Sequence, residues 1–236
     1  MHQRLIPVRR WEWIEVAARQ LPLLIPSEPD YAEASFLRAA SNEAAWTWLG
    51  RTEVWPDRRL ALFGEADRGK THLLRIWAGS TGAAVMDGPS LAEFPEVTAA
   101  AGVAIDNADH ADEAALLHLL NTAHDVDRPV LLVGRAAPAH WPVRLRDLDS
   151  RLRAITAVEV EAPDDDLLRR LLLHWLAERR LVADETLHDR LLLRLPRSPE
   201  VLRAAVARLD REALTSRKRT VTPGMVREAV AGVTGE

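Results

Sequence analysis

The sequence contains no cysteine, which excludes disulfide bonds, thiolate metal sites and cysteine nucleophiles. No apolar run approaches the roughly 18 residues that span a bilayer, so we do not expect an integral membrane protein. Charged residues interrupt the first 20 positions and no small-residue cleavage site follows, so we expect no secretory signal. These absences favour a cytoplasmic protein.

Lysine is almost absent as well. Lys70 and Lys218 are the two lysines among 31 basic residues, and all the others are arginine. The ammonium group of lysine is a compact point charge that a guanidinium group does not replace, so a retained lysine marks a position of interest. The formal net charge of -4 disfavours autonomous binding to nucleic acid, because domains that bind it are usually basic.

The rest of the composition is that of a globular protein. Hydrophobic residues make up 47% and charged residues 28% of the 236 residues, enough for a substantial core. Short apolar runs bounded by glycine, proline, aspartate or asparagine occupy residues 59–64, 82–87, 101–106, 129–134 and 155–162. Because helical patterns follow most of these runs, they predict an α/β fold with a parallel five-stranded sheet flanked by helices.

Helical periodicity accounts for much of the remaining chain. We expect a short helix over residues 9–19 and another over 42–51, with Ser41 as the cap of the second. From Asp164 onward the pattern is entirely helical. The helices expected there cover residues 164–180, 184–195, 198–216 and 223–232.

A phosphate-binding loop is the strongest signal in the sequence. Residues Gly64–Thr71 match G-x-x-x-x-G-K-[ST] between an expected strand and an expected helix. Backbone N–H groups and the helix dipole would surround phosphates, Lys70 would contact the terminal phosphates, and Thr71 would hold Mg²⁺. We therefore predict a site for ADP or ATP with Mg²⁺, whose nucleotide-binding residues include Gly64, Arg68 and Gly69.

The third apolar run delivers a second element of such a site. It ends at Asp106, which matches a Walker B carboxylate that holds Mg²⁺. Asn107 follows where active ATPases of this class usually have a glutamate, and an amide cannot act as a general base. Asp67 stands where many such loops have another glycine, and its charge is unfavourable beside a polyphosphate. These residues predict weak intrinsic hydrolysis and reduced nucleotide affinity.

Four local features, in this order, resemble a known family. They are QLPLLIP at 20–26, SFLRAASNEAAW at 35–46, IDNAD at 105–109, and LDREAL at 209–214 followed by TVTPGMVREAV. Together with the phosphate loop, they resemble the AAA+ domain of DnaA-type replication initiators and, within that group, the Hda family of short DnaA homologues. The resemblance covers about residues 20–231. It implies an AAA+ P-loop NTPase with a small all-helical lid.

The resemblance implies a division of the chain into three parts. We expect an N-terminal extension with a clamp-binding peptide over residues 1–26, an AAA+ nucleotide-binding domain over 27–162 and a helical lid over 163–236. Initiators continue past the lid into a helix-turn-helix domain, whereas this sequence ends at Glu236. We therefore expect no autonomous sequence-specific DNA binding, and self-association is left open.

The same resemblance implies two protein partners. The peptide containing Gln20, Leu21, Leu23 and Leu24 matches the segment by which the family binds the sliding clamp, the beta subunit of DNA polymerase III. An extended segment can bind a partner in this way, with the glutamine amide bonded to backbone groups and the leucines in an apolar pocket. The alternative is that this segment is an N-terminal strap packed on its own domain. Arg151 matches the arginine finger, which acts in trans on ATP held by the DnaA initiator, with Arg153 as the competing candidate.

At three other places the match to the family pattern is ambiguous or absent. Asn42 resembles a residue near the adenine, but asparagine at a helix start also has a structural role. Glu200 stands where initiators have a sensor-2 arginine, so Arg203 or Arg197 would have to reach the phosphates instead. Gly134 and Arg135 replace the small polar sensor that usually follows the fourth strand.

The function implied is negative regulation of chromosomal replication initiation. A clamp-docked adaptor that binds ADP or ATP would stimulate ATP hydrolysis by DnaA through Arg151 and would be at most a weak ATPase itself. A nucleotide-independent module that links clamp and initiator, with a degenerate AAA+ fold, is one alternative. A weak DnaA-like ATPase loader is the other.

Overall fold

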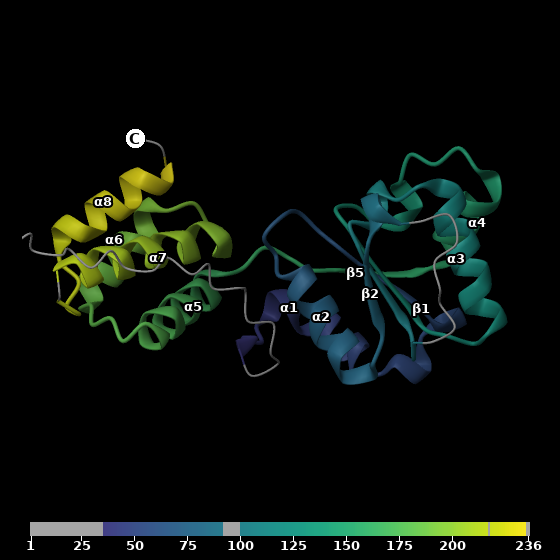
Figure 1. Cartoon of the computed structure of the whole chain (residues 1–236), viewed down its shortest axis with the longest axis horizontal. Coiled ribbons are helices and arrows are strands. Elements are labelled where there is room, and N and C mark those ends of the chain that lie inside the picture. The colour runs from purple at the N-terminus through teal and green to yellow at the C-terminus, as the bar shows by residue number, and fades with distance from the viewer. Residues whose placement is uncertain (1–34, 92–99, 217, 235–236) are drawn as a thin grey trace, which may run out of the picture.

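The computed structural model describes residues 35–91, 100–216 and 218–234. The helix expected over 9–19 and the expected clamp-binding residues Gln20–Leu24 lie outside these ranges. Within them, an α/β part and a bundle of four helices lie side by side along the long axis of the molecule (Figure 1). Across the described ranges, no helix is both long and apolar enough to cross a bilayer.

The α/β part is built on five parallel strands. They are β1 (Arg59–Phe63), β2 (Ala84–Asp87), β3 (Val103–Asp106), β4 (Val130–Gly134) and β5 (Thr156–Glu159), in the order β2-β3-β4-β1-β5. Each predicted apolar run contains one strand, so the prediction of a five-stranded parallel sheet is confirmed. Because all strands run in one direction, the loops after β1, β3 and β4 meet at the carboxyl edge of the sheet.

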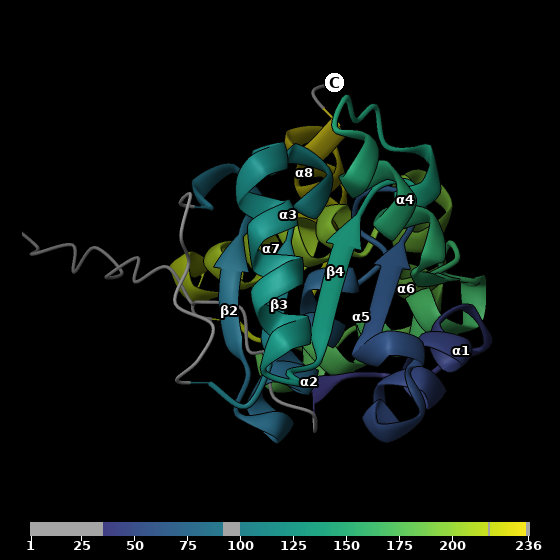
Figure 2. The same ribbon diagram turned by 90° about the vertical axis from the view of Figure 1, so that its right-hand side faces the viewer.

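Helices cover both faces of the sheet. They are α1 (Ala40–Leu49) and α2 (Lys70–Thr81) on one face, and α3 (Glu113–Asp125) and α4 (Arg146–Ala154) on the other. Figure 2 shows α3 in front of the sheet, with β4 visible beside it. Along β4, Leu131 and Val133 pack toward α1 and α2, while Val130 and Leu132 pack toward α3 and α4. Burial of both faces explains why the strands are apolar throughout.

Short 3-10 turns join several of these elements. In the described part of the chain they occupy Thr52–Val54, Pro56–Arg58, Gly88–Ser90, Ala108–His110 and Pro138–His140.

The start of α1 differs from the prediction. The helix begins at Ala40 and its cap is Ala39, so the assignment of Ser41 as the cap was wrong. The Asn42 side chain closes this end instead, because its Oδ1 accepts from Ala39 N at 3.0 Å and its Nδ2 donates to Leu37 O at 3.0 Å. Ser41 is buried in the first turn, where its carbonyl accepts a hydrogen bond from Glu161 N.

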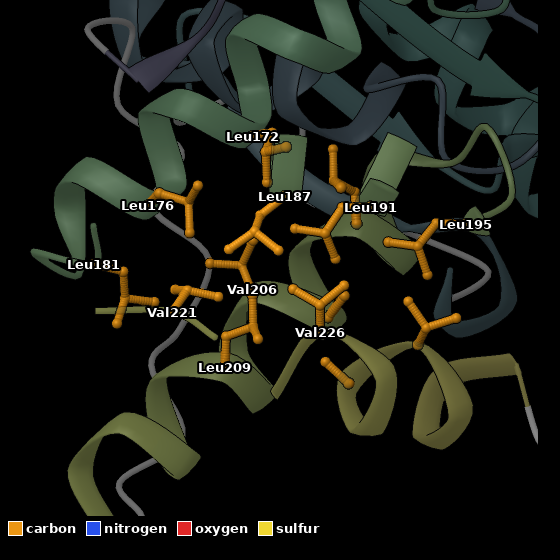
Figure 3. Packing of buried hydrophobic residues seen from close by; sticks show 14 of the residues in the cluster. Leu172, Leu176, Leu181, Leu187, Leu191, Leu195, Val206, Leu209, Val221 and Val226 are labelled. Atoms are coloured by element: carbon orange, nitrogen blue, oxygen red, sulfur yellow. The ribbon is translucent and has the colours of Figure 1, made fainter. Parts of the chain in front are cut away.

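Four helices form the second part of the molecule. They are α5 (Asp165–Glu178), α6 (Glu185–Arg194), α7 (Pro199–Ser216) and α8 (Pro223–Thr234). Their facing sides contribute leucine, valine and alanine to a single buried cluster that includes Leu172, Leu191, Leu209 and Val226 (Figure 3). Aspartates cap α5 and α6, since Asp164 accepts from Leu167 N and Asp184 from Leu187 N. The domain boundary at 162–163 stays a prediction.

Candidate nucleotide-binding site

The phosphate loop leaves β1 at a position that only glycine accommodates. Gly64 has φ 145°, and a Cβ at this residue would lie 2.5 Å from the carbonyl oxygen of Val160. Gly64 N donates to Arg135 O at 3.2 Å, which ties the loop to the end of β4. Asp67 adopts φ 62°, a left-handed conformation that aspartate tolerates better than most residues. The turn is therefore formed with Asp67 in place of the more usual glycine.

The two sequence motifs meet at the start of α2. Thr71 Oγ1 donates to Asp106 Oδ2 at 2.8 Å, so the hydroxyl of the phosphate loop and the Walker B carboxylate lie together. Lys70 Nζ donates to Glu65 O at 2.6 Å across the loop. Burial lowers the pKa of the Lys70 ammonium, and the Asp106 carboxylate opposes that shift. Hydroxyl and carboxylate oxygens are the hard donors that Mg²⁺ prefers, so this donor set fits the ion.

The Asn107 side chain is engaged in a hydrogen bond at the end of β2. Its Nδ2 donates to Asp87 Oδ1 at 2.9 Å, which fixes the amide against the end of β2. The residue has φ 51°, and a Cβ on the adjacent Gly88 would lie 2.1 Å from the Asn107 carbonyl oxygen. This crowding fixes the local backbone, and the amide remains unable to accept a proton from water.

A pocket of about 570 Å³ opens from the phosphate loop toward the four-helix part. Its size is in the range of small-molecule sites. The α/β part lines it with Phe36, Leu37, Ser41, Asn42 and the loop residues 67–72. The helical part contributes one face of α5 (Leu167, Leu171, His174, Trp175 and Glu178) and Pro199, Glu200 and Arg203 of α7. The pocket therefore has room for a nucleotide beside the loop that would hold its phosphates.

Aromatic side chains lie in the walls of this pocket. Phe36 stacks on Trp46 at 5.4 Å and meets the edge of His72 at 5.1 Å. The Arg203 guanidinium lies 5.9 Å from the Trp175 ring. Sequence reasoning missed Phe36 and Trp175, because an aromatic at helical spacing is normally read as core. Asn42 does line the pocket, but its side-chain amide is engaged in closing the start of α1.

Two predicted phosphate contacts are engaged elsewhere. Arg68 Nη1 donates to Glu159 Oε1 at 3.1 Å and to Val160 O at 3.2 Å, which anchors the loop to the end of β5. Arg197 Nη2 donates to Asp165 Oδ2 at 3.0 Å within the helical part. Arg203 lines the pocket, so of the two alternatives to a sensor-2 arginine it is the one placed beside the loop.

Arg151 lies far from the phosphate loop of its own chain. Arg151 lies in the last turn of α4, which ends at Ala154, and β5 begins two residues later at Thr156, which pairs with Leu60 near the start of β1. The phosphate loop follows the last residue of that strand, about 15 Å further along. Arg153, the competing candidate, is paired with Asp149 at 3.0 Å, while within the described ranges Arg151 has no ion pair.

Solved structures share this architecture. No family model and no curated protein sequence matches the chain. Domain III of the replication initiation protein DnaA from Thermotoga maritima is 19% identical, with a TM-score of 0.73 over 89% of this chain and 99% of that one. The chain has the AAA+ fold. The prediction of fold class, including the helical lid formed by α5–α8, is thereby confirmed.

Two further structures extend the comparison. A replication initiator DnaA bound to AMPPCP and single-stranded DNA is 17% identical, with a TM-score of 0.66 over 85% of this chain and 68% of that one. The RuvB Holliday junction branch migration motor of Thermotoga maritima is 18% identical, with a TM-score of 0.63 over 81% of this chain and 66% of that one. At these identities the similarity concerns the AAA+ fold alone.

Proposed function

We propose that this chain is an AAA+ adaptor that binds ADP or ATP with Mg²⁺ and regulates replication initiation. The observation that carries the proposal is the contact between Thr71 and Asp106 beside a pocket of about 570 Å³. Gly69, Lys70 and the start of α2 would hold the phosphates, while Thr71 and Asp106 would hold Mg²⁺, which neutralises phosphate charge. The amide of Asn107 in place of a base favours binding over turnover.

The regulatory role follows from the resemblance to the Hda family. In this proposal, Gln20, Leu21, Leu23 and Leu24 dock on the sliding clamp, and Arg151 reaches ATP held by DnaA. The position of Arg151 supports action in trans, because α4 ends beside the start of β1, whereas the phosphate loop of the same chain follows the other end of that strand. An arginine that stabilises transition-state charge on a neighbouring subunit accelerates hydrolysis there without turnover in its own chain.

The test is ATP hydrolysis by the cognate initiator with DNA-loaded clamp, with and without this protein. We expect acceleration that is lost in Arg151→Ala and in Gln20→Ala. Arg153→Ala is the matched control, since that arginine is engaged with Asp149 on the same helix, and it should retain the acceleration. If Arg151→Ala accelerates hydrolysis as well as the wild type does, the arginine-finger assignment is wrong.

A nucleotide-independent link between clamp and initiator is the second candidate. Asp67 and Glu200 favour it, because two carboxylates line the pocket beside the phosphate loop. Lys70→Ala should abolish the stimulation of DnaA if the chain is a nucleotide-binding adaptor. The same variant should still stimulate DnaA if the chain is a nucleotide-independent link. A third candidate, a weak ATPase loader, requires multiple turnover by the isolated protein despite Asn107, and a rate at buffer background would exclude it.

A further inference from the structure

The lid and the phosphate loop are joined by a contact between polar side chains. Ser198 Oγ donates to Asp67 Oδ2 at 3.1 Å, and the Glu200 side chain is hydrogen-bonded to the same carboxyl group. Ser198 also begins α7, because its Oγ accepts from Val201 N at 3.3 Å and its carbonyl from Leu202 N at 3.0 Å. Residues 67 and 198 are far apart in the sequence, so this contact is a property of the closed arrangement of the two parts.

The contact is attractive although two of its members are acids. The Asp67 carboxylate lies at the N-terminus of an 18-residue helix, where the exposed N–H groups and the helix dipole favour negative charge. The hydroxyl of Ser198 donates directly to it. The hydrogen bond to Asp67 and the charge of Asp67 raise the pKa of Glu200, so the repulsion between the two carboxyl groups is relieved when Glu200 takes up a proton.

Neighbouring cations do not neutralise this pair. Lys70 donates to Glu65 O, Arg68 to Glu159, and Arg203 lies over Trp175. Among the residues that the structure describes, no lysine or arginine forms an ion pair with Asp67 or Glu200. A polyphosphate on the loop would therefore bring its negative charge next to carboxyl groups that no ion pair among the described residues neutralises.

We propose that Asp67, Ser198 and Glu200 form a clasp that holds the lid on the phosphate loop and competes with nucleotide for it. The inference rests on the proposed nucleotide site and assigns it a regulatory element. Binding of nucleotide opens the clasp and moves the lid. The second polar contact between the parts, from Arg170 Nη1 to Arg38 O at 3.0 Å, lies outside the phosphate loop and remains as a pivot.

The experiment measures lid position and nucleotide affinity on the same protein. Because the chain has no cysteine, probes placed at Thr47→Cys on α1 and Ala204→Cys on α7 report the distance between the two parts without interference. Both positions are exposed. Ser198→Gly removes the hydroxyl while leaving a residue that is accepted at a helix start. Asp67→Gly removes the carboxylate at a position with φ 62°, where glycine is unstrained.

We expect Mg-ADP to lengthen the probe distance in the wild type. Ser198→Gly and Asp67→Gly should lengthen it without nucleotide and should bind fluorescent ADP about ten- to hundredfold more tightly, the range for loss of one hydrogen bond to a charged group. Ser216→Gly, the same substitution at the other end of α7, is the control and should change neither reading. Circular dichroism checks that each variant keeps the helix content of the wild type.

Each alternative result contradicts a different part of the proposal. A probe distance and an ADP affinity that stay at wild-type values in both clasp variants would overturn the clasp while leaving the nucleotide site intact. Longer distances without tighter binding would overturn the competition. Failure of the wild type and of both variants to bind ADP would overturn the nucleotide site itself, and the competition with it.

Discussion

The α/β part and the lid bury their apolar surface in different ways. The α/β core contains Trp55, Trp77 and Trp141, whose indole N–H groups donate to Trp48 O, Thr52 Oγ1 and Ala136 O at 2.7 to 2.9 Å. The buried cluster of the lid consists of leucine, valine and alanine. Buried indoles with fixed partners specify one orientation of the elements around them, whereas aliphatic packing between helices is less directional.

The candidate nucleotide pocket lies where these two parts meet. The α/β part supplies Lys70, Thr71 and Asp106, the residues with the chemistry of phosphate and Mg²⁺ binding. The lid supplies a largely apolar face of α5 and the acid of α7. In the proposed function, the α/β part therefore determines which ligand is bound and the lid determines how tightly it is enclosed.

The largest expected effects come from truncating one leucine in each core. Leu74 and Leu191 are both fully buried, so Leu74→Ala and Leu191→Ala should each cost about 2–5 kcal/mol of unfolding free energy. Because the two leucines belong to separate clusters, Leu191→Ala should unfold the lid first and Leu74→Ala the α/β part. Denaturant titration followed by tryptophan fluorescence and circular dichroism measures this. A single transition shifted equally by both variants would show that the parts unfold as one unit.

Removing the lysine of the phosphate loop tests whether the α/β part binds the phosphates. Lys70→Ala should weaken Mg-ADP binding about a hundredfold, since charge-assisted hydrogen bonds to phosphate are lost in a part-buried site. Isothermal titration calorimetry measures the affinity. Lys218→Ala removes the other lysine, which is exposed, and should bind like the wild type. Equal affinity of both variants would place the nucleotide elsewhere.

Arg135 offers a smaller and more selective test. Its carbonyl accepts from Gly64 N, and its positive charge is close enough to lower the pKa of Lys70, although burial and Asp106 affect that pKa more strongly. We expect Arg135→Ala to weaken ATP binding about tenfold while ADP binding changes less, because the extra phosphate adds charge near this arginine. Arg146→Ala, an exposed arginine on α4, is the control. Equal losses for both nucleotides would contradict a role at the terminal phosphate.

The smallest expected effect is the pH dependence of the lid contact. The hydrogen bond to Asp67 and the charge of Asp67 raise the pKa of Glu200 above its unfolded value, so the stabilisation is complete in acid and is lost as the pH rises through that raised pKa. The distance between probes at residues 47 and 204 should lengthen over this range. The other charged and titratable groups that line the pocket are Arg68, Lys70, His72, Glu161, His174, Glu178 and Arg203.

A pair of variants separates Glu200 from those groups. Glu200→Gln can still donate to Asp67 and does not ionise, so its probe distance should stay short across the titration. Glu185→Gln removes an acid from the first turn of α6 and should titrate like the wild type. A transition that persists unchanged in Glu200→Gln would assign the pH dependence to another titratable group of the pocket.

Much of this architecture was predictable because it depends on local composition. Each strand lies within an apolar run, since a strand buried on both faces needs continuous apolar residues. Gly64, Lys70 and Asp106 were predictable for a related reason. A phosphate loop needs particular residues at particular spacings, and a parallel sheet brings the ends of its strands to one edge.

Other features depended on which segments meet in space. Ser41 was the expected cap of α1, but its carbonyl accepts a hydrogen bond from Glu161 N, and the Asn42 side chain closes the helix. The pairing of Arg68 with Glu159 joins residues 91 positions apart.

The sequence by itself determined the strands, the helices and the phosphate loop, because periodicity and steric requirements act between neighbours in the chain. Only the tertiary structure decided that Trp175 lines the pocket and that Ser198 and Glu200 meet Asp67. Such contacts depend on how a lid packs against a loop more than 100 residues away in the sequence. A local sequence pattern does not predict which of these distant residues come into contact.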